Sequence, residues 1–379
     1  MTERAYLSYY GEQGIIPVHQ DTSDRELHYA RRRALYRQLG IAPLLMRGSR
    51  ILEFGPGTGD NALYLSFCEP ELCVLVDANA ASLEAVSDKL ARGLLDGSCF
   101  ECHRNDIREY RDARQFDLVL CEGVVPGQQD PESFLRHVAS FAAVDGIVVC
   151  TTMSSPSLLA EVCRRVIKVV LASRIGCHDG LLAELTSFFE PDLLMLPGMS
   201  RRHEDWVLDN ILHPWPARFT FTIPEAIDSL DSDFDVLGTS PTFVQDWRWY
   251  KSIPRDSRTW NDVAREEYRR WELYFIDYRL APSAPVPAIS GELDAACSRA
   301  LDVQRGIWQG NSVGEIPRFS ATLREIENII ADPAPETARA IRDYLVGLDK
   351  LMQGDFQPDF GSFRSWFGRG QQYVSFSRR

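Results

Sequence analysis

The sequence has no apolar run long enough to cross a membrane. Its longest candidate, VIKVVLASRIG, contains Lys168 and Arg174, and a spanning helix needs about 20 predominantly apolar residues. The first residues, MTERAYLSYYGEQ, also lack the basic and apolar regions of a secretory signal. We therefore expect a cytoplasmic protein with no membrane partner.

Basic residues are too few for a general nucleic-acid binder. The chain has 41 Lys and Arg against 54 Asp and Glu, which leaves a net charge of −13. Proteins that bind nucleic acid usually carry a basic surplus, because phosphates dominate that affinity. Nucleic acid is therefore not expected as a partner, although short Arg runs such as Arg201–Arg202 would suit a pocket for an anion.

A disulfide framework is not expected either, since the nine cysteines are odd in number and should stay reduced in the cytoplasm. Cys99, Cys102 and His103 form the pattern that attaches c-type haem. They fall in a predicted strand, where residues three apart point to opposite faces, so the two thiols should not converge on a haem or metal. No other His, Cys, Asp or Glu group has convincing metal spacing, and we predict no metal.

What the sequence does contain is a regular alternation of strands and helices. Strands are predicted over residues 50–54, 72–76, 98–103, 116–121 and 146–151. Helices are predicted over 24–39, 60–67, 81–95 and 131–142, the first with the apolar residues Leu27, Ala30, Ala34, Leu35 and Leu39 on one side. Such alternation predicts a doubly wound α/β sheet with its ligand beyond the carboxyl ends of the strands.

A glycine-rich turn follows the first strand. Gly55, Gly57 and Gly59 separate Glu53 from the next helix, and the second strand ends in Asp77. Glycines allow the backbone to approach a ligand, and an acid after the second strand can accept both hydroxyls of a ribose. A dinucleotide fold would require a glycine at position 60, which is Asp60. The spacing instead favours a sulfonium nucleoside that has an amino-acid tail and no phosphate.

Four segments in order resemble the motifs of class I S-adenosylmethionine-dependent methyltransferases: ILEFGPGTGDNALYL, VLVDANAASL, RNDIREY and FDLVLCEGVV. The resemblance implies a mostly parallel seven-stranded Rossmann-like sheet, an N-terminal lid, helical insertions and S-adenosylmethionine as cofactor. Carried over by position, it implies the cofactor-binding residues Glu53, Gly55, Gly57, Gly59, Asn61, Asp77, Ala78, Asp106, Ile107, Cys121, Glu122 and Gly123.

The same resemblance divides the chain into six segments. They are a lid and helix (1–49), the cofactor-binding core (50–154), a substrate-facing insertion (155–223), the sixth-strand region (224–253), a helical cap or insertion (254–366) and the closing strand (367–379). In the fourth of these, an aromatic-rich segment is expected to continue the sixth strand. The cap suits a bulky acceptor or a homodimer interface.

The acceptor is much less clearly marked. Position 122 onward reads EGVVPG, which lacks the Asn/Asp-Pro-Pro-aromatic motif of enzymes that methylate planar amino groups. Glu122, His203 and His19 are the candidate catalytic residues, since they offer acid and base groups near the predicted transfer point or in flanking segments. The candidate substrate contacts are Tyr9, Tyr10, Gln20, Asp205, Trp206 and Arg248.

The leading hypothesis is methyl transfer to O or N of a small or medium-sized biosynthetic acceptor: a metabolite, a sugar-linked molecule or a peptide natural product. An RNA or protein methyltransferase is the alternative enzyme. A non-catalytic cofactor-binding scaffold is the third possibility. The sequence alone leaves all three open.

Overall fold

The structure is a computed structural model that describes residues 19–175, 180–216, 218–310 and 312–379. The chain forms two compact units. The first unit combines residues 1–153, 214–268 and 371–379, and the second combines residues 154–213 and 269–370. Tyr9 and Tyr10 lie outside the described residues.

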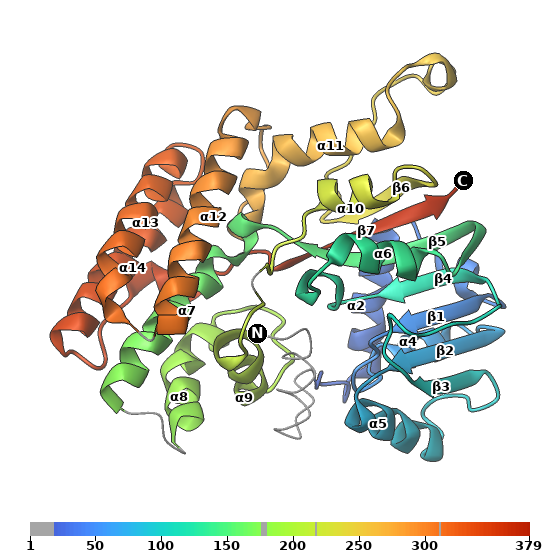
Figure 1. The fold of residues 1–379 in the computed structure, drawn as a ribbon, viewed down its shortest axis with the longest axis horizontal. Coiled ribbons are helices and arrows are strands. Elements are labelled where there is room, and N and C mark those ends of the chain that lie inside the picture. Colours follow the sequence, from blue (N-terminus) through green and yellow to red (C-terminus); the bar gives the residue numbers. More distant parts are fainter. Residues whose placement is uncertain (1–18, 176–179, 217, 311) are drawn as a thin grey trace. The chain divides into compact units, whose positions relative to one another are not determined.

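A seven-stranded sheet forms the centre of the first unit (Figure 1). In chain order its strands are β1 (Arg50–Phe54), β2 (Leu72–Asp77), β3 (Phe100–Arg104), β4 (Phe116–Cys121), β5 (Ala142–Met153), β6 (Phe234–Ser240) and β7 (Gln371–Arg378). Their spatial order is β3-β2-β1-β4-β5-β7-β6, and only β7 runs antiparallel to its neighbours. The predicted doubly wound, mostly parallel sheet of seven strands is therefore confirmed.

The strands at the centre of this sheet are covered on both faces. Consecutive residues of β1, from Ile51 to Phe54, are all buried, as are Leu118 to Cys121 of β4. Since side chains of a strand alternate between faces, burial of neighbours requires cover on both sides. The helices of this unit are α2 (Arg25–Gln38), α3 (Pro43–Met46), α4 (Ala62–Phe67), α5 (Ala80–Ala91), α6 (Pro131–Ala139) and α10 (Ile223–Leu230).

The apolar side of helix α2 is mostly not its buried side. Leu27, Ala30 and Ala34 are exposed, and Leu35 is only half-buried. The buried stripe is His28, Arg32, Tyr36 and Leu39, one residue per turn along the helix. Of the apolar residues on the predicted side, Leu39 is fully buried, and the other core positions of α2 are taken by groups that find polar partners inside the protein.

Several other boundaries differ from the prediction. Helix α5 ends at Ala91 rather than Leu95, before Gly93, which has a positive φ of 66°. Strand β6 stops at Ser240, so the aromatic-rich segment after it does not continue the strand. Strand β3 is an outermost strand of the sheet, with a single neighbouring strand, and Cys102 on it is exposed.

The second unit consists of helices. Its α-helices are α7 (Ser155–Ile175), α8 (Leu181–Leu194), α9 (His203–Trp206), α12 (Pro287–Gly310), α13 (Ile316–Ile330) and α14 (Pro335–Gln353), and α11 (Trp260–Trp271) begins in the first unit. Short turns of 3₁₀ or π type cover Val207–Leu212, Glu272–Phe275, Val313–Glu315 and Gly361–Ser365. Both predicted insertions contribute to this one unit.

A buried charge network holds the helices of the second unit together. Arg164 on α7 pairs with Asp192 on α8 at 3.1 Å, and Arg364 pairs with the same carboxylate at 2.7 Å. The Arg164 guanidinium also lies 3.9 Å from the ring centroid of Phe367. Among the described residues, no helix of either unit is long and apolar enough to cross a membrane.

Candidate functional site

The glycine loop begins directly after β1. Gly55, Gly57 and Gly59 have φ values of 71°, 55° and 74°, which lie in the left-handed region that favours glycine. A Cβ on Gly55 would lie 2.6 Å from Val124, and one on Gly59 would lie 2.8 Å from Val86. A Cβ on Gly57 would meet no atom within 4 Å. The loop therefore packs at its two ends and leaves open space at its middle.

Asp60 holds this loop in place. Its carboxylate accepts hydrogen bonds from the Thr58 hydroxyl at 2.7 Å and the Gln20 backbone N–H at 3.0 Å, and it pairs with Lys89 of α5 at 3.0 Å. The Lys89 ammonium also donates to the Thr58 carbonyl at 2.8 Å. Asp60, whose presence in place of a glycine argued against a dinucleotide fold, therefore connects the loop to Gln20 and Lys89.

Helix α2 and the segment before it also contact the loop. His28 Nε2 donates to the Asp60 carbonyl at 2.9 Å, and burial lowers the pKa of this imidazole. Gln20, predicted to contact substrate, donates from its side chain to Asn61 at 3.3 Å. Gln20 therefore lies at the glycine loop together with Asn61, a predicted cofactor contact.

Asp77 lies beside the loop at the end of β2. Its carboxylate accepts from the backbone N–H groups of Asn79, Gly57 and Ala78 and from the Ser82 hydroxyl. Burial raises the pKa of Asp77, and these hydrogen bonds oppose that rise. A carboxylate held against the open position of the loop is well placed for a ligand that occupies that position.

Asp106 and Ile107 follow β3 at the same edge of the sheet. The Asn105 N–H donates to the Asp77 carbonyl at 3.2 Å, which joins the ends of β3 and β2. Asp106 pairs with Arg108 at 3.1 Å and remains partly exposed. The Ile107 carbonyl accepts from His137 Nε2 at 2.8 Å, and burial lowers the pKa of His137.

The third strand end at this edge belongs to β4. Cys121 is fully buried opposite Phe54 of β1, and burial raises the pKa of its thiol. Glu122 comes next, followed by Gly123, which has a φ of 78° and donates its N–H to the Thr151 hydroxyl at 2.7 Å. The cofactor-binding residues predicted from the three strand ends therefore lie along one edge of the sheet.

Glu122 is not free to face solvent. Arg32 of α2 donates to both of its carboxylate oxygens, at 2.6 Å and 2.9 Å, and the Tyr36 hydroxyl donates to it at 3.1 Å. The Arg32 guanidinium lies 4.7 Å from the centroid of the Tyr36 ring. Because both partners are buried, this ion pair is shielded from the screening that weakens surface pairs.

Glu53, near the end of β1, is an acidic residue whose carboxyl group lacks a full set of hydrogen-bond partners among the described residues. It is buried, and its Oε2 has no hydrogen-bond partner among the described residues. Burial, followed by the nearby charge of Glu122, raises the pKa of Glu53 to about 8. An unsatisfied buried carboxyl next to the open glycine loop is suited to a cationic group of a ligand.

The remaining predicted acceptor residues lie elsewhere in the chain. His19 is exposed just before Gln20. Arg248 pairs with Asp246 at 2.6 Å in the segment between β6 and α11. His203, Asp205 and Trp206 form α9 of the helical unit.

Within that helical unit the three residues of α9 differ in burial. His203 lies 3.6 Å from Glu190. Asp205 and Trp206 are buried, and the Trp206 ring packs edge-on against Phe189 and Phe367, with centroids 6.3 Å apart in both cases. Their roles toward an acceptor stay predictions.

Sequence reasoning missed His28, Arg32, Tyr36 and Lys89 as members of the site. His28, Arg32 and Tyr36 recur every four residues, which is the spacing of one helix face. That spacing was visible in the sequence, but the neighbouring Leu and Ala residues formed a more conventional apolar pattern. Lys89 has no comparable signal, because its partner Asp60 is 29 residues away.

Parts of the chain are similar to known proteins. A family model described as a methyltransferase domain matches residues 24–191. A putative methyltransferase from Thermoplasma acidophilum is 20% identical, with 28% of this chain and 44% of that chain covered and a TM-score of 0.25. The N-methyltransferase NodS from Bradyrhizobium japonicum WM9 is 18% identical, with 40% of this chain and 74% of that chain covered and a TM-score of 0.32. PKMT2 from Rickettsia typhi, in complex with AdoHcy, is 14% identical, with 63% of this chain and 50% of that chain covered and a TM-score of 0.46.

The aligned region thus spans less than half of the Thermoplasma protein and half of the Rickettsia protein. Comparison with the sequences of characterised proteins finds no match.

Proposed function

A methyltransferase-domain model matches residues 24–191, and from this premise we propose that the chain is a class I S-adenosylmethionine-dependent enzyme that methylates O or N of a small or medium-sized biosynthetic acceptor. One observation carries the proposal: Gly57 with open space above it, Asp77 and Asp106 lie at successive strand ends along one edge of the sheet. Ligands of open α/β sheets bind at this edge.

The residues at this edge fit the parts of S-adenosylmethionine. Asp77 would accept hydrogen bonds from the ribose hydroxyls, and Asp106 with Ile107 would contact adenine. Glu53, with its unpartnered Oε2, and Glu122 would face the ammonium of the methionine part. Arg32 supplies a buried positive charge for the carboxylate of that same part.

The cofactor, when bound, supplies an electrophilic methyl group. The chain must then orient the acceptor in line with that group, exclude water and, for some acceptors, remove a proton. The resemblance implies that Glu122 would lie nearest the transfer point, and Arg32 holds its carboxylate through two hydrogen bonds. A role as proton acceptor requires Glu122 to share its oxygens with the acceptor. His203 and His19 remain candidates for the group that accepts this proton.

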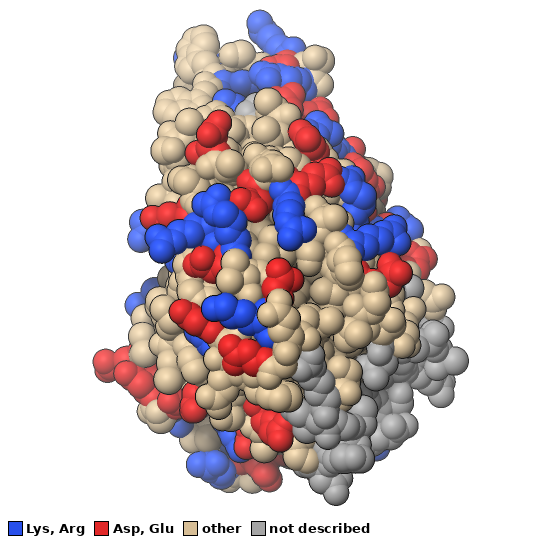
Figure 2. Space-filling view, turned by 90° about the vertical axis from the view of Figure 1, so that its left-hand side faces the viewer, with Lys and Arg blue, Asp and Glu red and all other residues tan. Residues whose placement is uncertain are grey.

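The charge of the chain supports a small acceptor over a nucleic acid. The face shown in Figure 2 carries Lys and Arg side chains interspersed with Asp and Glu. Polyanion binding uses continuous basic surface instead. The net charge of −13 points the same way. We therefore place metabolites, sugar-linked molecules and peptide natural products ahead of RNA.

Calorimetric titration of the full chain with S-adenosylmethionine tests the proposal. We expect binding of S-adenosylmethionine and none of NAD. Asp77→Ala removes the proposed ribose contact and one hydrogen bond to the Gly57 backbone. The affinity for S-adenosylmethionine should therefore fall roughly 10- to 100-fold, as expected for hydrogen bonds to a charged group. Asp88→Ala, an exposed carboxylate on α5, is the matched control. Unchanged affinity in Asp77→Ala, or binding of NAD alone, would contradict the assignment.

The acceptor requires a second experiment. Purified chain with S-adenosylmethionine carrying a labelled methyl group is incubated with cell extract separated into small-molecule, protein and RNA fractions. Label in the small-molecule fraction supports the proposal. Label in protein or RNA would identify the alternative enzyme, and binding without transfer to any fraction would point to a scaffold.

A further inference from the structure

The first unit contains a second concave site, on the edge of the sheet opposite the glycine loop. Asp235, which lines this pocket, pairs with Ser377 of β7, and Ser377 pairs with Ile147 of β5. Ile147 pairs with Leu118, which pairs with Ile51 at the start of β1. The glycine loop follows the other end of β1. This pocket is therefore separate from the proposed cofactor site.

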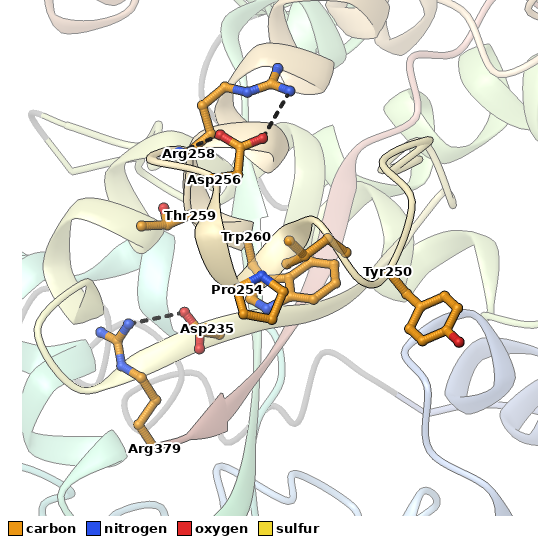
Figure 3. Close-up of a pocket in the computed structure, with 9 residues that line it drawn as sticks. Asp235, Tyr250, Pro254, Asp256, Arg258, Thr259, Trp260 and Arg379 are labelled. Atoms are coloured by element: carbon orange, nitrogen blue, oxygen red, sulfur yellow. Dashed lines mark hydrogen bonds and ion pairs between the residues drawn. The ribbon is translucent and has the colours of Figure 1, made fainter.

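The pocket has a volume of about 460 Å³ and largely apolar walls (Figure 3). It is lined by Asp235, Tyr250, Ile253, Pro254, Asp256, Arg258, Thr259, Trp260 and Arg379. Two ion pairs lie among these residues, Asp235 with Arg379 at 3.1 Å and Asp256 with Arg258 at 3.5 Å. The polar groups nearest the apolar walls are thus already paired with one another.

Most of the lining belongs to the segment between β6 and α11, residues 241–259, which we call the aromatic arm. It extends away from the sheet as a yellow-orange loop in Figure 1. Trp247, Trp249 and Tyr250 on the arm are 90%, 64% and 69% exposed, and Trp260 just after it is 44% exposed. Four large aromatic side chains exposed within 14 residues mark an interaction surface rather than ordinary scatter.

The arm is built to hold these side chains outward. Arg248, between the two tryptophans, pairs with Asp246 at 2.6 Å and donates to the Arg258 carbonyl at 2.6 Å. Its guanidinium lies 5.5 Å from the Trp260 ring centroid. These contacts join the two ends of the arm, so its backbone would lose little conformational entropy on binding a partner.

Charge on and beside the arm is of opposite sign. The arm carries four basic and two acidic residues, and its Lys251 and Arg255 are exposed. Residues 228–235, which end at the pocket, contain four aspartates and no basic residue. Within that stretch Asp233 is exposed, and the Asp228 side chain is 67% exposed. Arg265 pairs with Asp228 and Asp231, and Arg379 pairs with Asp235, which leaves a smaller net negative charge beside the net positive charge of the arm. The surface is therefore self-complementary in charge.

From this self-complementarity we infer that a second copy of the chain docks here. Related by a twofold axis, two copies place the exposed tryptophans of each arm against the apolar pocket of the other, and each basic arm faces the other's acidic stretch. A twofold contact of this kind uses the same patch on both copies and closes on itself. Buried Trp and Tyr side chains are the residue types that dominate the energy of such interfaces.

Sedimentation of the full chain between about 1 and 100 µM tests this inference. We expect the wild type to form dimers in this range. Trp247→Ala/Trp249→Ala should raise the dimer dissociation constant at least ~30-fold, the change that corresponds to the ~2 kcal/mol of an interface hot spot. Lys251→Glu/Arg255→Glu should also weaken the dimer and reduce its sensitivity to salt.

Leu194→Ala, an exposed apolar truncation in the helical unit, is the matched control and should leave the dimer intact. Thermal midpoints of all variants verify folding. A wild type that stays monomeric at the highest concentration would overturn the inference, and so would a Trp247→Ala/Trp249→Ala variant that dimerises as the wild type does. Neither outcome bears on cofactor binding, which is measured separately.

Discussion

Arg32 and Glu122 form a buried two-point ion pair between α2 and the end of β4, with N–O distances of 2.6 Å and 2.9 Å. This contact fixes the N-terminal helix over the edge of the sheet where the cofactor is proposed to bind. It also explains why α2 can place a polar stripe inward, since each buried polar group there finds a partner from the sheet or the glycine loop.

Breaking this pair on one side should be costly. Arg32→Met leaves the Glu122 carboxylate buried without its counter-charge, which typically costs about 3–5 kcal/mol of unfolding free energy. Replacing both partners, in Arg32→Met/Glu122→Leu, removes the uncompensated charge and should recover most of that loss. Urea denaturation of the two variants measures the difference. A double variant no more stable than Arg32→Met would show that the pair is not the source of the loss.

The glycines of the loop should respond differently to alanine. Gly57→Ala adds a methyl group where no atom lies within 4 Å, so its cost to stability is limited to about 1 kcal/mol for the left-handed φ. The methyl group would, however, occupy the space proposed for the cofactor and should weaken S-adenosylmethionine binding at least about tenfold.

Gly55→Ala is the contrasting variant, because its methyl group would lie 2.6 Å from Val124. We expect a larger fall in the midpoint of urea denaturation for Gly55→Ala than for Gly57→Ala. Titration calorimetry on both folded variants gives the affinities. Wild-type affinity in Gly57→Ala would contradict the placement of the cofactor above the loop.

Glu53 should make stability depend on pH in a specific direction. Its pKa of about 8 in the folded chain lies above the ordinary value of 4.5, so the folded state binds more protons between these pH values. Stability contributed by the protonated carboxyl is present at low pH and is lost as pH rises through about 8.

Glu53→Gln removes this titration, so the variant should gain stability relative to the wild type between pH 6 and pH 9. Urea denaturation at both pH values measures the change. Glu84→Gln, an exposed acid on α5, is the control and should follow the wild type. A constant difference between Glu53→Gln and the wild type at both pH values would contradict the raised pKa.

The sheet could be predicted from the sequence because its central strands are buried apolar runs separated by turn residues. Phe116 to Cys121 and the glycines after Phe54 are local signals, and the order of elements then determines a doubly wound topology. The cofactor-binding candidates were implied by the resemblance to the methyltransferase motifs, which lie at or just after the ends of β1 to β4.

What could not be predicted depends on pairing between distant residues. The Arg32–Glu122 pair joins positions 90 residues apart, and nothing local to α2 distinguishes a buried Arg from a surface one. The aromatic arm resembled a strand continuation because tryptophans are usually buried, whereas here Trp247 is 90% exposed. Only the tertiary structure separates an aromatic core from an aromatic surface.

Lys89 provides a test of whether the glycine loop is held in advance of binding. Its ammonium bonds the Asp60 carboxylate at 3.0 Å and the Thr58 carbonyl at 2.8 Å, so it links α5 to both sides of Gly59. Lys89→Met keeps most of the aliphatic stem and removes these two bonds. Because the loop must then be ordered on binding, we expect S-adenosylmethionine affinity to fall about 5- to 30-fold.

Stability should change much less in the same variant, by about 1 kcal/mol, since the Lys89 side chain remains partly exposed and its stem still packs. Lys350→Met, an exposed lysine near the end of α14, is the control for loss of a surface charge. Calorimetric titration and urea denaturation of both variants separate the two effects. A Lys89→Met chain that binds as the wild type does would show that Thr58, His28 and Gln20 suffice to hold Asp60 and the loop, and an equal loss in Lys350→Met would assign the effect to net charge.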